Sequence, residues 1–78
     1  MDVDAEYLDM MINNFNYAIE NNTELCYMGY SIIDDDNIKE YWIKKSEWIK
    51  TIDLLINEAA EIEEYEYAAE LKKIKELI

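Results

Sequence analysis

The run EAAEIEEYEYAAELKKIKELI, from Glu58 to Ile78, decides the fold because it carries a helical pattern after a change of phase. Tyr67, Leu71, Ile74 and Ile78 recur at intervals of four, three and four residues, which places one apolar stripe along one helical face. Glutamate and lysine occupy most of the other positions. The spacing therefore predicts an amphipathic helix over about 64–78.

The segment before this run predicts a second, longer helix. Its apolar positions follow near-heptad spacing with one break at Lys45, and they are Ile38, Tyr41, Trp42, Trp48, Ile49, Ile52, Leu55, Ile56 and Ala59. The cluster Asp34-Asp35-Asp36-Asn37 is typical of a helix start, because short acidic side chains accept bonds from free backbone N–H groups. We expect a helix over about 36–61. The phase change at 62–65 then predicts an antiparallel helical hairpin, with one continuous helix over 37–78 as the alternative.

The first third of the chain predicts one more helix and a linker. Asp2 and Asp4 are candidate N-caps for a helix over about 4–21, which Asn21-Asn22 would end. Residues 23–33 have β-branched and aromatic side chains without a clear period, and a lone strand there has no obvious partner. We expect an irregular linker. The predicted fold is all-α: one domain over 1–78, built as a small three-helix bundle with a C-terminal helical hairpin.

Composition restricts the partners. The formal net charge is −12, with 19 acidic residues, seven lysines, no arginine and no histidine, while 51% of residues are hydrophobic. A chain without basic clusters is not expected to bind nucleic acid or anionic membranes directly, and a basic protein surface is favoured. The alternative is that the charge serves only solubility and association rate.

The start of the chain and the cysteine content indicate a compartment. MDVDAEY carries no basic segment, and no apolar run is long enough for a signal peptide or a membrane span. The single cysteine, Cys26, has no internal disulfide partner and is expected to be a buried hydrophobic residue. We expect the cytoplasm, including that of a phage-infected bacterium.

Catalytic and metal chemistry lack the residues they need. Without histidine there is no His-based general base, and one cysteine cannot complete a zinc site. The single glycine excludes phosphate-binding glycine motifs. An EF-hand reading of the segment that begins at Asp34 places Lys39 and Lys45 where glycine and glutamate are required. The chain is therefore expected to be no enzyme and to hold no metal or cofactor.

A pattern of alanine pairs and aromatics marks the C-terminal segment. Its elements are Ala59-Ala60, Tyr65-Glu66, Ala68-Ala69-Glu70-Leu71, Ile74 and Leu77. This pattern resembles the UVR motif, a short helical hairpin of nucleotide-excision-repair proteins. The chain is one residue shorter between Leu71 and Ile74, and it lacks the family's arginine.

The resemblance implies hairpin-to-hairpin pairing with a repair or other nucleic-acid-processing protein. The expected pairing surface consists of Tyr65, Tyr67, Ala68, Leu71 and Ile74. The chain would then be a non-enzymatic adaptor, and Leu71→Lys would abolish binding.

Two other readings stay open. Helical carboxylates three or four residues apart are about 5–6 Å apart, so an acidic surface of Asp53, Glu58, Glu61 and Glu64 could imitate nucleic-acid phosphates and block a DNA-binding enzyme. The exposed apolar remainder could instead form a homodimer. Trp42 or Trp48 is either a core residue or a binding anchor, since tryptophan is common at interface hot spots.

Overall fold

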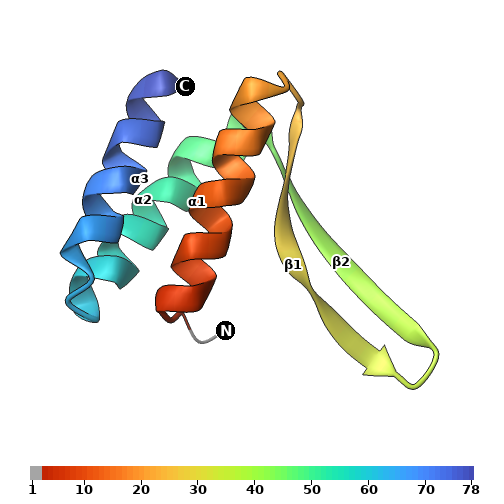
Figure 1. Ribbon diagram of the computed structural model, residues 1–78. Coiled ribbons are helices and arrows are strands. Elements are labelled where there is room, and N and C mark those ends of the chain that lie inside the picture. Colours follow the sequence, from red (N-terminus) through yellow and green to blue (C-terminus); the bar gives the residue numbers. More distant parts are fainter. Residues whose placement is uncertain (1–2) are drawn as a thin grey trace.

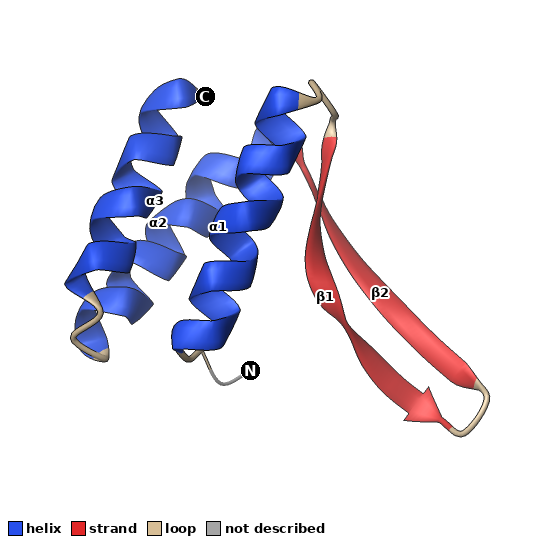
Figure 2. Ribbon diagram, in the orientation of Figure 1, coloured by secondary structure: helices blue, strands red, loops and turns tan. Residues whose placement is uncertain are grey.

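The computed structural model describes residues 3–78 as three helices and a two-stranded antiparallel β-hairpin (Figures 1 and 2). In chain order the elements are α1 (Ala5–Glu20), β1 (Leu25–Asp34), β2 (Asn37–Lys44), α2 (Lys45–Glu61) and α3 (Tyr65–Leu77). The helices lie together, and the hairpin diverges from α1 toward its tip (Figure 1). The all-α prediction is therefore wrong.

The first helix begins and ends as its terminal residues dictate. The Asp4 carboxylate accepts a bond of 2.8 Å from the backbone N–H of Tyr7, so Asp4 is the N-cap; Asp2 lies outside the described residues. At the other end Asn22 adopts a φ of 54°, and the N–H of Thr23 bonds to the carbonyl of Ala18 at 3.0 Å. This is a Schellman ending, which asparagine tolerates because it enters the left-handed region readily.

The predicted linker over 23–33 is a strand. β1 pairs with β2 from Leu25 opposite Lys44 to Asp34 opposite Asn37, with irregularities after Tyr27 and after Ile32. Gly29 follows the first irregularity with a φ of 132°, a conformation that side-chain-bearing residues rarely adopt. The missing strand partner was the segment assigned to the start of the long helix.

The aspartate cluster closes a hairpin turn instead of starting a helix. The Asp34 carboxylate accepts bonds from the backbone N–H of Asp36 at 3.0 Å and from the Asn37 amide at 2.9 Å. These bonds lower the pKa of Asp34, the Asn37 amide contributing most. Short polar side chains stabilise turns and helix starts by the same local bonds, so the cluster alone does not distinguish the two.

The predicted helix over about 36–61 is divided at Lys44. Residues 37–44 form β2, which places Tyr41 and Trp42 on a strand, and α2 begins only at Lys45. The Trp48 indole N–H donates to the carbonyl of Ile43 at 3.0 Å, and the N–H of Lys45 donates to the carbonyl of Glu24 at 2.9 Å. These bonds fix the junction between hairpin and helix.

The helix break predicted at 62–65 is present. Glu63 has a φ of 62°, and the N–H of Glu64 reaches the carbonyl of Ala59 at 2.8 Å in a second Schellman ending. The alternative of one continuous helix over 37–78 is therefore excluded.

One hydrophobic core joins all five elements. Phe15 and Trp48 meet edge to face at its centre, with ring centroids 6.0 Å apart. The buried residues are Leu8, Met11, Ile12, Phe15, Ala18, Cys26, Ile43, Trp48, Ile52, Leu55, Ala59, Ala68, Leu71 and Ile74. Cys26 and Ile43 are the only strand residues in this set, so the core holds the base of the hairpin and leaves its distal part outside.

Candidate protein-binding surface

The stripe expected to pair with a partner hairpin is mostly inside the molecule. Ala68, Leu71 and Ile74 are buried in the core, where α3 packs against both α1 and α2. Tyr67 is half-buried, and Tyr65 is exposed. Helix α1 thus covers the face that the UVR resemblance assigned to a partner, and only the two tyrosines are accessible from outside.

The four residues expected to form an acidic row do not share one environment. Asp53 accepts a bond of 2.7 Å from the Lys75 ammonium, which neutralises part of its charge. Glu58 and Glu61 are exposed, whereas Glu64 is half-buried at the turn before α3. Within residues 3–78 the other ion pair is Lys73 with Glu70 at 3.8 Å, so most acidic side chains there carry their charge without a lysine partner.

The hairpin has two chemically different faces, set by its register. Cys26 and Ile43 are opposite each other and buried, so their face points toward the helices. Ser31, Lys39 and Tyr41 continue that inner face; the Ser31 and Tyr41 hydroxyls are 2.9 Å apart, and the Lys39 ammonium lies 5.4 Å from the Tyr41 ring centre. Polar contacts therefore occupy the inner face beyond the core.

The opposite face, which we call the outer face, is apolar and largely open to solvent. At its base, Leu25, Tyr27 and Trp42 border a pocket of about 440 Å³ together with Asn14 and Tyr17 of α1. Its cross-strand pairs are Leu25 with Lys44, Tyr27 with Trp42, Tyr30 with Glu40, and Ile32 with Ile38. The exposed fractions are 52% for Trp42, 62% for Tyr30, 69% for Ile32 and 65% for Ile38. Large apolar side chains gathered this way on one surface indicate an interaction site, because monomeric proteins seldom expose contiguous apolar patches.

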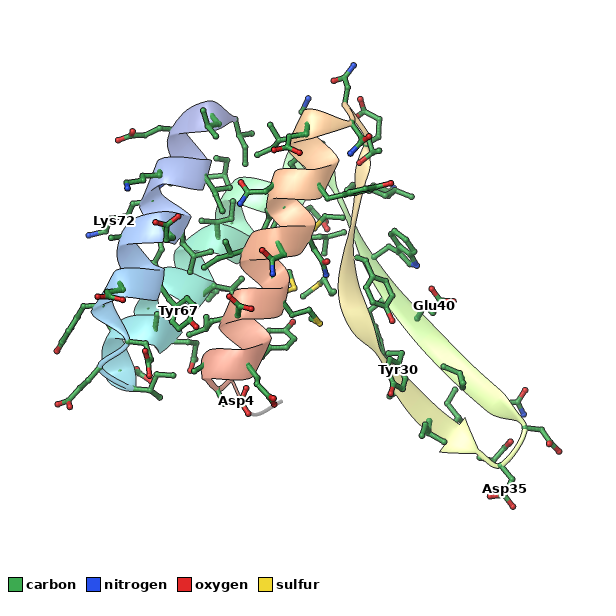
Figure 3. All side chains as sticks on the ribbon, viewed as in Figure 1. Asp4, Tyr30, Asp35, Glu40, Tyr67 and Lys72 are labelled. Carbon is green, nitrogen blue, oxygen red and sulfur yellow. The ribbon has the colours of Figure 1, made fainter. Side chains whose placement is uncertain are left out.

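Glu40 is the only acidic residue on the outer face. Its strand neighbours on that face are Ile38 and Trp42, and Tyr30 lies opposite. Figure 3 shows Glu40 projecting from β2 on the side away from the helices. Tyr27 packs on Trp42 edge to face at 5.0 Å; desolvation raises the pKa of the Tyr27 hydroxyl, and the Glu40 charge raises it further.

A groove of about 570 Å³ lies between the hairpin and α1. Tyr7 and Met10 line it from α1. Residues of both hairpin faces line its other side: Tyr27, Met28, Gly29, Tyr30, Ser31 and Tyr41. The Tyr7 hydroxyl is buried and has no hydrogen-bond partner within residues 3–78, and burial raises its pKa. Beyond the core, an open space thus separates the distal part of the hairpin from α1. Closer to the core, the Asn14 side-chain amide donates a hydrogen bond of 3.0 Å to the Tyr27 carbonyl.

The Cys26 thiol should make stability fall at high pH. Burial raises its pKa from 9.0 to about 11. Between these values the unfolded chain loses the thiol proton while the folded chain keeps it, so rising pH favours unfolding, by up to about 3 kcal/mol in total. Urea unfolding at about pH 8 and about pH 11 measures the loss.

Cys26→Ala separates this effect from the titration of lysines and tyrosines. The variant lacks the thiol, so its free energy of unfolding should fall less over the same pH interval. An equal fall in both proteins would contradict the assignment to Cys26.

The residues of the outer face were not singled out by the sequence as a surface. The sequence predicts Trp42 and Trp48 on one helix, each as a core residue or a binding anchor. Ile38 and Trp42 are four residues apart, a spacing that fits one face of a strand and one face of a helix equally well, so this pair does not distinguish the two.

Comparison with known proteins gives no family for this chain: no family model, no curated protein and no solved structure matches it. Over residues 3–78, no helix combines the length and apolar character that crossing a membrane requires. The same residues contain no cluster of three or more histidine, cysteine, aspartate or glutamate side chains placed to hold a metal ion.

Proposed function

We propose that the chain is a non-enzymatic adaptor that binds a nucleic-acid-processing protein, and that the outer face of the hairpin is its contact surface. The observation that carries the proposal is the solvent exposure of Trp42, Tyr30, Ile32 and Ile38 on a hairpin that projects beyond the core. Two strands alone are marginally stable in water. A partner that covers the outer face would bury its apolar side chains and would stabilise the hairpin conformation.

Two features support the class of partner. The pattern of α2 and α3 resembles the UVR motif, which implies a repair or other nucleic-acid-processing protein as the partner. Because α1 covers the stripe that would pair in that motif, the contact is proposed on the hairpin instead. The net charge of −12 favours a basic surface, and proteins that bind nucleic acids carry such surfaces. The reduced, buried Cys26 fits the cytoplasm as the compartment.

Capture from extracts of the source organism tests the proposal when it compares two variants. Ile32→Thr/Ile38→Thr/Trp42→Thr removes the apolar outer face and keeps residues that favour strands. Leu54→Gln/Leu77→Gln removes two exposed leucines from the helices and is the matched control. The native chain and the control should recover the same nucleic-acid-processing protein, identified by mass spectrometry, and the hairpin variant should not.

The salt dependence of partner binding distinguishes this proposal from the alternative, in which the chain is a DNA mimic. Contact through the outer face should persist at about 1 M salt, where exposed charge interactions are largely screened. A mimic would release its partner at that salt concentration and would compete with DNA. Recovery of the same partner by the hairpin variant would contradict the proposal, and light scattering of the purified chain would reveal a homodimer.

A further inference from the structure

The centre of the outer face is a carboxylate surrounded by aromatic and aliphatic side chains. Glu40 lies between Ile38 and Trp42 along β2 and opposite Tyr30 on β1. Within residues 3–78 it forms no ion pair. The single lysine of this face, Lys44, is four residues away along the strand, which is about 13 Å.

A partner that covers this face must also satisfy Glu40. An unpaired carboxylate buried among apolar groups is strongly unfavourable, so the covering surface has to bring a positive charge or polar donors. The aromatic surroundings narrow the choice of cation. A guanidinium stacks on aromatic rings and donates two parallel bonds to a carboxylate, whereas an ammonium is more strongly hydrated and donates as a point charge.

A second copy of the chain does not meet this requirement. If two outer faces packed together about a twofold axis, both Glu40 carboxylates would enter the same interface. The chain contains no arginine, and Lys39 belongs to the inner face. Lys44, the lysine of the outer face, could meet the other copy's Glu40 only as a strongly hydrated ammonium, without the stacking and paired bonds of a guanidinium. Two chains of net charge −12 also repel each other. The charge pattern therefore favours a different, basic protein.

The three aspartates at the tip of the hairpin also favour a basic partner protein. Asp34, Asp35 and Asp36 are exposed at the end of the hairpin, next to Ile32 and Ile38 (Asp35 is labelled in Figure 3). From the base of the hairpin to its tip, a partner bound to the outer face would therefore contact apolar side chains first and the aspartates last. Basic residues at the rim of an apolar cleft would match this order.

We infer that the outer face binds an apolar segment of a basic protein through an arginine whose guanidinium pairs with Glu40 and stacks beside Trp42 and Tyr30. This inference rests on the proposed function, since it names the partner chemistry of the same surface. It adds one requirement, which is that binding depends on Glu40 and on arginine.

Titration with designed peptides tests this requirement without knowledge of the partner. The two probes are the arginine peptide VRVRVRVRV and its matched lysine counterpart VKVKVKVKV, each capped at both ends and used at physiological salt. Trp42 fluorescence reports binding, because the other tryptophan, Trp48, is buried. The arginine peptide should bind about fivefold or more tightly than the lysine peptide, given the bidentate and stacking contacts of arginine.

The variant Glu40→Gln should weaken binding of the arginine peptide about tenfold, because a charge-assisted pair is lost. Glu76→Gln, which removes the same charge from the exposed surface of α3, is the matched control and should change affinity less than about twofold. Circular dichroism of both variants verifies the fold.

Three results would overturn the inference. They are equal effects of the two variants, equal affinity for the two peptides, and no fluorescence change up to millimolar peptide. The proposed function would survive any of these if the native partner is still lost on removal of Ile32, Ile38 and Trp42, and retained by Glu40→Gln.

Discussion

Leu71→Lys is expected to unfold the protein. Leu71 is fully buried where α3 meets the core, and the core residues given above include no charged group that could pair with an ammonium there. Loss of the leucine contacts costs about 2–5 kcal/mol, and burial of an unpaired charge costs several more. A chain of this length has a total stability of roughly 4–12 kcal/mol at typical values per residue.

Circular dichroism and chemical unfolding measure this effect directly. Leu71→Lys should lose its cooperative transition, whereas Leu77→Lys, at a 66% exposed position on the same helix, should stay within about 0.5 kcal/mol of the native chain. A folded Leu71→Lys protein would show that α3 does not pack as described. The sequence suggested this variant as a test of partner binding, but unfolding would abolish binding for reasons unrelated to a partner surface.

Trp48→Ala is expected to destabilise the protein by about 4 kcal/mol, the middle of the range for large aromatic truncations. Trp48 is 1% exposed, contacts Phe15 edge to face and donates its indole N–H to the Ile43 carbonyl. The alanine variant leaves a cavity and removes the indole bond to the Ile43 carbonyl at the junction of β2 and α2. The loss should therefore also loosen the base of the hairpin.

Trp42→Ala provides the contrast. Trp42 is half-exposed and packs mainly on Tyr27, so its removal should cost about 1 kcal/mol. Urea unfolding compares the two variants, and hydrogen exchange of the β1 and β2 amides shows whether Trp48→Ala loosens the hairpin. Equal losses for the two tryptophans would contradict the assignment of Trp48 to the core and Trp42 to the surface.

The helices were predictable wherever an apolar stripe and a terminal signal agreed. Asp4 and Asn22 mark α1 by ordinary capping chemistry, and the change of phase near Ile62 marks the break between α2 and α3. Between residues 23 and 44 the local signals conflict. Ile38, Trp42 and Ile49 fit a helical stripe, and Ile38 and Trp42 also fit one face of a strand. The pairing of β1 with β2 decided between them, and such pairing is a contact between segments that no local pattern contains.

The site was hidden by the same conflict. If residues 38–44 were helical, Trp42 would lie beside core residues and Glu40 on a solvated face. The two side chains share one surface only because this segment is a strand. The sequence predicts that a partner hairpin covers the apolar stripe of α3. Its cover is α1, because Leu8, Met11, Phe15 and Leu71 share one core.

The bond of 2.9 Å from the Lys45 N–H to the Glu24 carbonyl closes the base of the hairpin, where the chain leaves α1 and enters α2. The two ends of the hairpin are therefore adjacent in space. The length of its strands can vary without changing how α1 and α2 are connected. Because side chains alternate between faces with a period of two, residues added or removed in pairs on each strand would keep Trp42 and Ile38 outside. An odd change would turn the distal part over and present Lys39 and Ser31 in their place. Related chains with longer or shorter arms are therefore expected to differ by even numbers on each strand.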